Sequence, residues 1–189
     1  MSVLVVTPPA RLVPLDDMKD HLRVTSGDED ELIEAYIDAA CAWLDGPDGW
    51  LGRCVGEQVL EVRYGTGRGL TAFDAGPDIT VPIGPVISIV EAEYWDHDGV
   101  AADLDVETFE LRHDVVDWGA ETAWLGRANR VRLRYRAGYA DPPKPILQAV
   151  KLLVGQWYRN RSAINVGNIV NELPNGVKAL LGPYHRRRV

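Results

Sequence analysis

The sequence predicts an α+β protein: a small helical bundle, in which N-terminal helices pack with a C-terminal helix, with a β-rich insertion and an extended C-terminal tail. Apolar residues recur at helical spacing near both ends, over 28–44 and 146–161, whereas the middle of the chain alternates and is interrupted by turn residues. The apolar stripes of the two terminal helices are too wide for a lone helix, so we expect these helices to pack on each other.

The 189 residues are enough for one domain, or for one domain with an insertion. We divide the chain into four parts. Residues 1–53 are an N-terminal arm and helices, and residues 54–137 are the β-rich insertion. Residues 138–161 are the C-terminal helix that completes the helical body, and residues 162–189 are a loop, a short helix and a basic docking tail.

The N-terminal part begins with an extended arm, because three prolines interrupt residues 1–14. A short helix is expected over 15–23 and a longer one over 28–44, each starting with acidic residues that suit the positive end of a helix. The residues of the longer helix that we expect in the core are Leu32, Tyr36 and Trp43.

The middle part is predicted as strands. Residues 58–64 alternate between two faces, and residues 96–99 (Asp-His-Asp-Gly) predict a turn between two strand-like segments. The other expected strands are residues 79–83, 86–95, 108–113 and 130–135.

The C-terminal part begins with a proline cluster, which is tolerated in the first turn of a helix. The helix that follows, to residue 161, is expected to place Leu153 and Trp157 in the core. After a polar loop, residues 175–181 predict a short helix that Gly182-Pro183 ends.

Charge is unevenly distributed along the chain. The net charge is −8, but Lys144 to Val189 carries eight Lys/Arg and one acid, for +7, and the rest carries −15. An acidic body with a basic end argues against general nucleic-acid binding by the body. It suits head-to-tail contact between copies, or contact with an acidic partner.

The two cysteines, Cys41 and Cys54, and the four histidines are scattered along the chain and do not have the spacing of a metal-binding or catalytic set. The cysteines are expected to be buried free thiols, with a disulfide as the alternative. No apolar run approaches the ~20 residues that a membrane span needs, so no membrane partner is expected.

No catalytic, metal or cofactor site is predicted. Residues 65–69 (Gly-Thr-Gly-Arg-Gly) resemble a phosphate loop but lack the spacing of a dinucleotide fingerprint and any Gly-Lys-Ser/Thr ending. The turn acids near His97 could ligate a metal, and Asp114, Asp117 and Glu121 could form an acid/base pair. A polar turn and surface acids are the favoured interpretations.

Two sets of residues are candidates for contact with other proteins. The first is the docking tail, with apolar anchors followed by arginines that can pair with carboxylates; a solvated tail or contact with DNA are its alternatives. Its members are Leu180, Leu181, Tyr184, Arg186, Arg187 and Arg188.

The second set could join copies in a ring, because opposite charges lie on different helices; the alternative is that these arginines act within one protomer. Its members are Asp28, Glu29 and Glu31 at the start of one helix and Arg159 and Arg161 at the end of another.

The order of these pieces resembles the head-tail connector (adaptor) proteins of long-tailed phages, the group similar to gp6 of phage HK97 and gp8 of phage phiE125 that includes the adaptors of gene transfer agents. The resemblance covers nearly the whole chain and departs around 114–130. The segments that carry it are Leu15 to Val24, Asp28 to Leu44, Val81-Pro82-Ile83-Gly84-Pro85-Val86, Tyr135-Arg136-Ala137-Gly138-Tyr139, Trp157-Tyr158-Arg159-Asn160-Arg161 and Leu173-Pro174-Asn175-Gly176-Val177.

The resemblance implies a non-enzymatic structural protein that forms a ring under the portal, with about twelve copies if it matches the symmetry of a portal ring. A heterologous contact that closes makes such a ring. Its partners would be the portal protein, the next neck or tail protein and other copies of itself. Genome DNA would pass through its channel without sequence-specific binding. It would lie at the head-tail interface of the virion, after assembly in the host cytoplasm. The alternatives are a stopper or tail-completion protein, or an enzyme with an unrecognised site.

Overall fold

The computed structural model describes residues 2–65, 78–118, 128–160 and 174–186. The chain forms two compact units. The β unit comprises residues 1–9 and 57–139, and the helical unit comprises residues 10–56 and 140–189. The predicted α+β class is confirmed, with helices and two antiparallel sheets in the parts that the structure describes.

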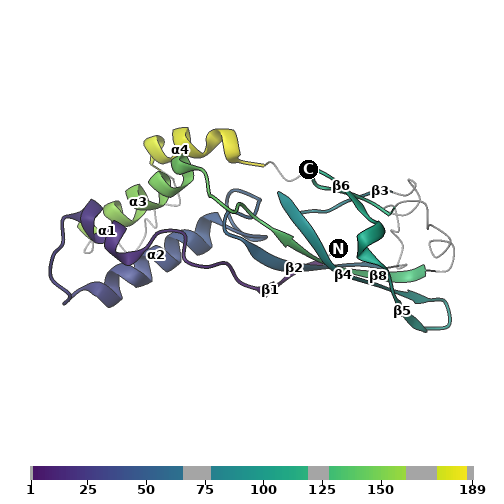
Figure 1. Ribbon diagram of the computed structural model, residues 1–189. Helices are drawn as coiled ribbons and strands as arrows, with labels where there is room; N and C mark the ends of the chain where they lie inside the picture. The colour runs from purple at the N-terminus through teal and green to yellow at the C-terminus, as the bar shows by residue number, and fades with distance from the viewer. Residues whose placement is uncertain (1, 66–77, 119–127, 161–173, 187–189) are drawn as a thin grey trace, which may run out of the picture. The chain divides into compact units, whose positions relative to one another are not determined.

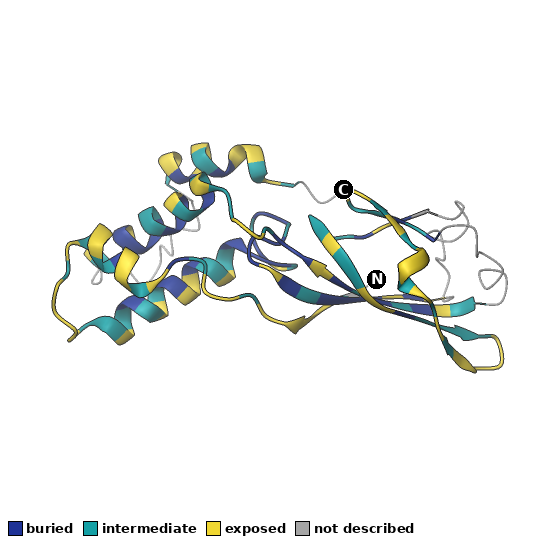
Figure 2. Ribbon diagram, viewed as in Figure 1, coloured by how far each residue is buried: buried dark blue, intermediate teal, exposed yellow. Residues whose placement is uncertain are grey.

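The helical unit is built on two long helices that pack together, as predicted. They are α2 (Asp30–Leu44) and α3 (Lys144–Arg159). The shorter α1 (Leu15–Leu22) contacts both of them, and α4 (Asn175–Leu181) packs on α3 and continues into a 3-10 turn, η2 (Gly182–Tyr184). Figure 2 shows the buried residues as an inner stripe on these helices.

The core of the helical unit comes from segments far apart in the sequence, because an amphipathic helix gains most of its stability by burying its apolar face. α2 contributes Ile33, Ile37, Ala40 and Leu44 to this core. α3 contributes Ile146, Ala149, Val150, Leu153 and Val154, and α4 contributes Val177 and Leu181.

The β unit contains a five-stranded antiparallel sheet of order β1-β2-β8-β4-β5 (Figure 1). Its strands are β1 (Ser2–Thr7), β2 (Gln58–Gly65), β4 (Val86–Asp96), β5 (Ala101–Asp103) and β8 (Ala128–Ala137). A smaller sheet of order β3-β7-β6 is formed by β3 (Asp78–Thr80), β6 (Glu110–Arg112) and β7 (Val115–Asp117), and a 3-10 turn, η1 (Val106–Thr108), precedes β6.

The large sheet has one apolar and one charged face, because side chains alternate along each strand. The buried residues on the apolar face include Leu60, Val62 and Tyr64 of β2 and Val131, Leu133 and Tyr135 of β8. Arg132, Arg134 and Arg136 of β8 lie on the opposite face and are partly or largely exposed.

The N-terminal residues, predicted as an extended arm, form β1 and pair antiparallel with β2. Their pairing partner could not be predicted, because fifty residues separate the two strands in the sequence. Cys41 and Cys54 are free thiols, as predicted; Cys54 is buried, as expected, but Cys41 is only partly buried. Among the described residues, no helix has both the length and the apolar character to cross a membrane.

Candidate functional site: interaction surfaces

The polar turn at the end of β4 is structural. Asp96 Oδ1 accepts hydrogen bonds from the backbone N–H groups of Asp98 and Val100, at 2.9 and 2.8 Å, so this carboxylate shapes the turn. Within the described ranges, no group of three His, Cys, Asp or Glu side chains could hold a metal ion. Residues 66–69 of the glycine-rich segment lie outside the described residues.

The loop acids that could have formed an acid/base pair have structural partners. Asp114 Oδ1 accepts a hydrogen bond from the Val86 N–H at 3.2 Å, and Asp117 pairs with Arg112 at 3.1 Å. Glu121 lies outside the described residues.

The predicted docking residues of the tail lie partly within the core of the helical unit. Leu181 is fully buried in the core of the helical unit, so its side chain is not available to a partner in this structure. Leu180 and Tyr184 are half-buried and pack against the same core. Arg187 and Arg188 lie outside the described residues.

The end of the described tail is held against the loop that follows α2. The rings of His185 and Trp50 lie 4.4 Å apart, and the Arg186 N–H donates to the Leu51 carbonyl at 2.9 Å. Gly52 makes this approach possible: its φ is +64°, and a Cβ there would lie 2.7 Å from the Arg186 carbonyl oxygen. We call this contact the tail clamp. It was not predicted, because the loop and the tail are about 130 residues apart.

The predicted ring-interface acids at the start of α2 are partly engaged within the helical unit. Glu29 accepts a hydrogen bond from the Tyr158 hydroxyl, and Asp28 accepts one from Ser26. Glu31 is exposed. Both donors are neutral hydroxyls, so the two carboxylates keep their charge, but each has a hydrogen-bond partner within the helical unit.

Of the two arginines predicted at the end of α3, the structure describes Arg159. Arg159 is exposed, and its Nε donates to the carbonyl of Gly155 in the same helix at 3.0 Å. It forms no ion pair with any residue of the described ranges. Arg161 lies outside them.

Four of the five predicted core residues, Tyr36, Trp43, Leu153 and Trp157, belong to the core of the helical unit or pack against it. Leu153 is buried, and Leu32 is half-buried. Trp157 of α3 is half-buried and lies against two rings of α2, with centroids 6.3 Å from Tyr36 and 6.4 Å from Trp43.

The charged face of the large sheet holds a network of ion pairs centred on Glu61. This carboxylate is 3% exposed and binds Arg63 at 2.6 Å and Arg134 at 2.8 Å. Burial alone would raise the pKa of Glu61, but the hydrogen bonds from the two arginines outweigh it and lower the pKa below its ordinary value. Arg134 also binds Glu91 at 2.9 Å, so one guanidinium joins β2 to β4 across β8.

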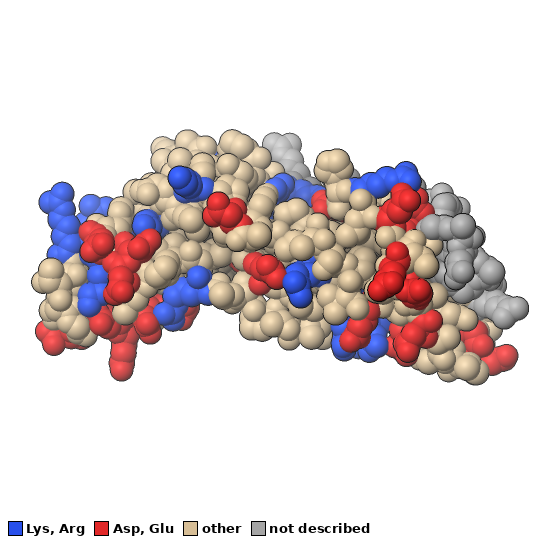
Figure 3. All heavy atoms as spheres, in the orientation of Figure 1, with Lys and Arg blue, Asp and Glu red and all other residues tan. Residues whose placement is uncertain are grey.

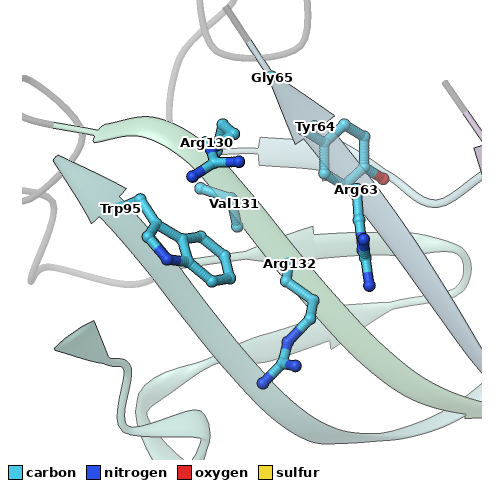
Figure 4. A pocket seen from close by; sticks show the side chains of 7 residues that line it. All are labelled: Arg63, Tyr64, Gly65, Trp95, Arg130, Val131 and Arg132. Carbon is cyan, nitrogen blue, oxygen red and sulfur yellow. The ribbon is translucent and has the colours of Figure 1, made fainter. Parts of the chain in front are cut away.

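At the end of the same face, where β2 finishes, there is an open pocket of about 480 Å³, which we call the arginine pocket (Figure 4). The guanidinium carbon atoms of Arg130 and Arg132 lie 5.2 and 6.0 Å from the centroid of the Trp95 ring, within cation–π range. The residues that line this pocket are Arg63, Tyr64, Gly65, Trp95, Arg130, Val131 and Arg132.

The arginine pocket was missed at the sequence level, although part of its signal was available. Arginines at 130, 132, 134 and 136 alternate along one strand and therefore share one face of the sheet. Their neighbours could not be predicted, because the pairing of β8 with β4 contains register shifts that sequence spacing does not show.

The resemblance to head-tail connector proteins is supported by comparison with known proteins. Residues 13–61 match the family described as "Phage gp6-like head-tail connector protein". This segment holds α1, α2 and the first residues of β2. No curated protein matches the chain in sequence.

Solved structures share the fold over the whole chain. One is a chain from the neck of an empty gene transfer agent particle computed with C6 symmetry, at 24% identity and a TM-score of 0.72. Another comes from the virion of a native gene transfer agent particle, at 24% identity and a TM-score of 0.73. A third comes from the neck of a native particle computed with C12 symmetry, at 21% identity and a TM-score of 0.65. In each case the match covers 100% of this chain and 97% of the other.

Proposed function

We propose that this protein is a structural head-tail connector in the neck of a tailed phage or a phage-like particle such as a gene transfer agent. The observation that carries the proposal is the match of residues 13–61 to the connector family, and the full-length fold shared with gene transfer agent neck chains supports it. In this role the protein joins other proteins and catalyses no reaction.

In the proposed assembly, copies form a ring beneath the portal, extend the DNA channel and present a surface to the next neck or tail protein. Closed rings need two different surfaces on each copy. The symmetry of the structures that share the fold, C6 in one and C12 in another, agrees with such a ring. Genome DNA passes through the channel without sequence-specific contacts, in keeping with a chain of net charge −8.

The docking surface toward the portal is proposed on the tail, without Leu181. The half-buried Leu180 and Tyr184 lie at the edge of the core, and the arginines at 186–188 can pair with carboxylates of a partner. Binding by these arginines requires that the tail beyond Tyr184 reaches the partner, either from the clamped position or after the clamp opens.

The ring contact of the helical unit is proposed on Glu31 and Arg159, which are exposed, together with Arg161. Asp28 and Glu29 have hydrogen-bond partners inside the unit, so the proposed contact does not rest on them.

The test is co-expression with the portal protein of the same particle, followed by purification through a tag on the portal. We expect the wild-type chain to co-purify and deletion of 187–189 to weaken recovery without changing the melting temperature, because none of the described contacts depends on those residues. Deletion of 183–189 also removes the tail clamp and should lower the melting temperature. Absence of the wild-type chain from purified portal would refute the proposal.

A further inference from the structure

We propose that the arginine pocket of one copy receives the acidic β4–β5 hairpin, residues 96–103, of a neighbouring copy, so that β units contact each other head to tail. The inference rests on the proposed ring, and it identifies one of the two complementary surfaces that such a ring requires.

The receiving surface is positive and partly prearranged. Its lining carries three arginines and no carboxylate. Arg130 is exposed and forms no ion pair with a described residue, and the Arg63 side chain is 68% exposed. The guanidinium groups of Arg130 and Arg132 lie within cation–π distance of the Trp95 ring, and such a contact lowers the entropy that these side chains lose when an anion binds. Figure 4 shows Arg63 and Arg132 extending to the same side from neighbouring strands.

The surface that enters the pocket is acidic with an apolar tip. Residues 96–103 contain Asp96, Asp98 and Asp103 and no Lys or Arg. Asp98 and Asp103 are exposed and form no ion pair within the described residues, and Val100 is 62% exposed. Figure 3 shows acidic side chains around the tip of this hairpin. Carboxylates can bind the arginines bidentately while Val100 packs on the Trp95 ring.

The hairpin cannot fill the pocket of its own copy. Trp95 pairs with Arg130 on one side and with Ala101 on the other, so the tip, residues 97–100, continues beyond the pocket along the strand direction. β5 forms one edge of the sheet, and Arg63 lies on β2, toward the opposite edge. The pocket and the hairpin tip are therefore two different surfaces at one end of the large sheet, and a contact between them is heterologous.

DNA is a less suitable occupant of the pocket. The β unit holds fifteen Asp/Glu and eight Lys/Arg, for a net charge of −7. Beside the pocket, Glu61, Glu91 and Glu93 pair with the arginines of this face. A long polyanion would cross these carboxylates, whereas a short acidic hairpin meets only the arginines.

The test is self-association of the full chain, measured by sedimentation velocity at low and high salt. Arg130→Glu and Asp98→Arg should each weaken association at least about tenfold at low salt, and the chain carrying both should recover it, because the swapped charges meet again between copies. Val100→Ser should weaken association without changing its salt dependence. Arg136→Glu is the matched control, on the same strand and face but outside the pocket, and should behave as wild type.

Disulfide trapping on the portal gives a second measurement for copies that associate only there. Arg63→Cys copies mixed with Asp98→Cys copies should cross-link under oxidation, and neither variant alone should do so. The inference is overturned if the paired charge swap fails to recover association and no cross-link forms. It is also overturned if short duplex DNA binds wild type, Arg130→Glu abolishes that binding, and association is unchanged.

The same variants separate this inference from the proposed function. If they leave association unchanged but wild type still co-purifies with portal, the hairpin contact is wrong and the connector role stands. If wild type does not co-purify with portal, the connector role itself fails.

Discussion

At the scale of single residues, Glu61 of β2 binds Arg63 of the same strand and Arg134 of β8, and Arg134 extends the network to Glu91 of β4. A buried carboxylate is tolerated only when its lone pairs are satisfied, and here both oxygens accept hydrogen bonds from guanidinium groups, one from Arg63 and one from Arg134. The network therefore makes the stability of the β unit depend on the ionisation of one side chain.

We expect Glu61→Gln to lower the free energy of unfolding by about 1–3 kcal/mol at pH 7, because it leaves two arginines without their shared carboxylate. The pKa of Glu61 is lowered in the folded state. Ionised Glu61 therefore stabilises the folded state fully when the pH is above the pKa that this carboxyl has in the unfolded chain. This stabilisation is lost as the pH falls through the lower pKa that the carboxyl has in the folded chain. Urea unfolding at pH 7 and pH 3 should show a smaller difference between wild type and Glu61→Gln at pH 3. If wild type and Glu61→Gln differed by the same free energy of unfolding at pH 3 as at pH 7, the stabilising role of the ionised Glu61 carboxylate would be contradicted.

Gly52 is the second residue whose environment leads to a prediction. A side chain at this position would combine a left-handed backbone with a clash against the Arg186 carbonyl, so Gly52→Ala should cost about 1–2 kcal/mol and open the tail clamp. Hydrogen exchange at the Arg186 amide, which donates to Leu51, reports the opening. Gly176→Ala is the control, because a Cβ there meets no atom within 4 Å. Unchanged protection of Arg186 in Gly52→Ala would show that the clamp does not need this glycine.

At the scale of elements, the packing of α2 against α3 holds the helical unit together. An aromatic cluster lies near the C-terminal end of α3. Trp157 contacts both Tyr36 and Trp43, whereas Arg159, two residues later, is exposed and bonds only to its own helix in the described structure. Neighbouring residues of α3 thus face different environments.

We expect Trp157→Ala to destabilise the protein by about 3 kcal/mol, through lost burial and ring contacts, and Arg159→Glu to leave the melting temperature near that of wild type. Thermal unfolding followed by circular dichroism measures both. A large loss of stability in Arg159→Glu would mean that this arginine acts inside the protomer.

The elements show what the sequence can and cannot predict. The short helix over 175–181 was predicted with the bounds it has, and the strand over 58–64 differs from β2 by one residue, because local periodicity and turn residues define both. β1, the tail clamp and the arginine pocket were missed. Each of them depends on partners distant in the sequence, and no local pattern specifies such pairing.

At the scale of the whole molecule, the chain forms two units with separate cores. Leu133 of β8 and Leu153 of α3 are both leucines with exposures of 0% and 1%, one in each unit, so they make a matched pair of probes. We expect Leu133→Ala and Leu153→Ala each to cost about 2–5 kcal/mol in the unit that holds the residue. Hydrogen exchange should show faster opening confined to that unit. If either substitution accelerates exchange equally in both units, the chain unfolds as one cooperative body.

The division of the two units along the chain also decides the order in which they can form during synthesis. The β unit needs residues 1–9 and 57–139, so all of its strands are translated, and emerge from the ribosome, ahead of α3. α1 and α2 are among the first elements translated, yet their apolar faces stay uncovered until residues 144–159 emerge, because α3 is the helix that covers them. A nascent chain that has exposed residues up to 139 but not yet α3 can complete the large sheet while the apolar faces of α1 and α2 are still uncovered, and those faces are where a chaperone would bind.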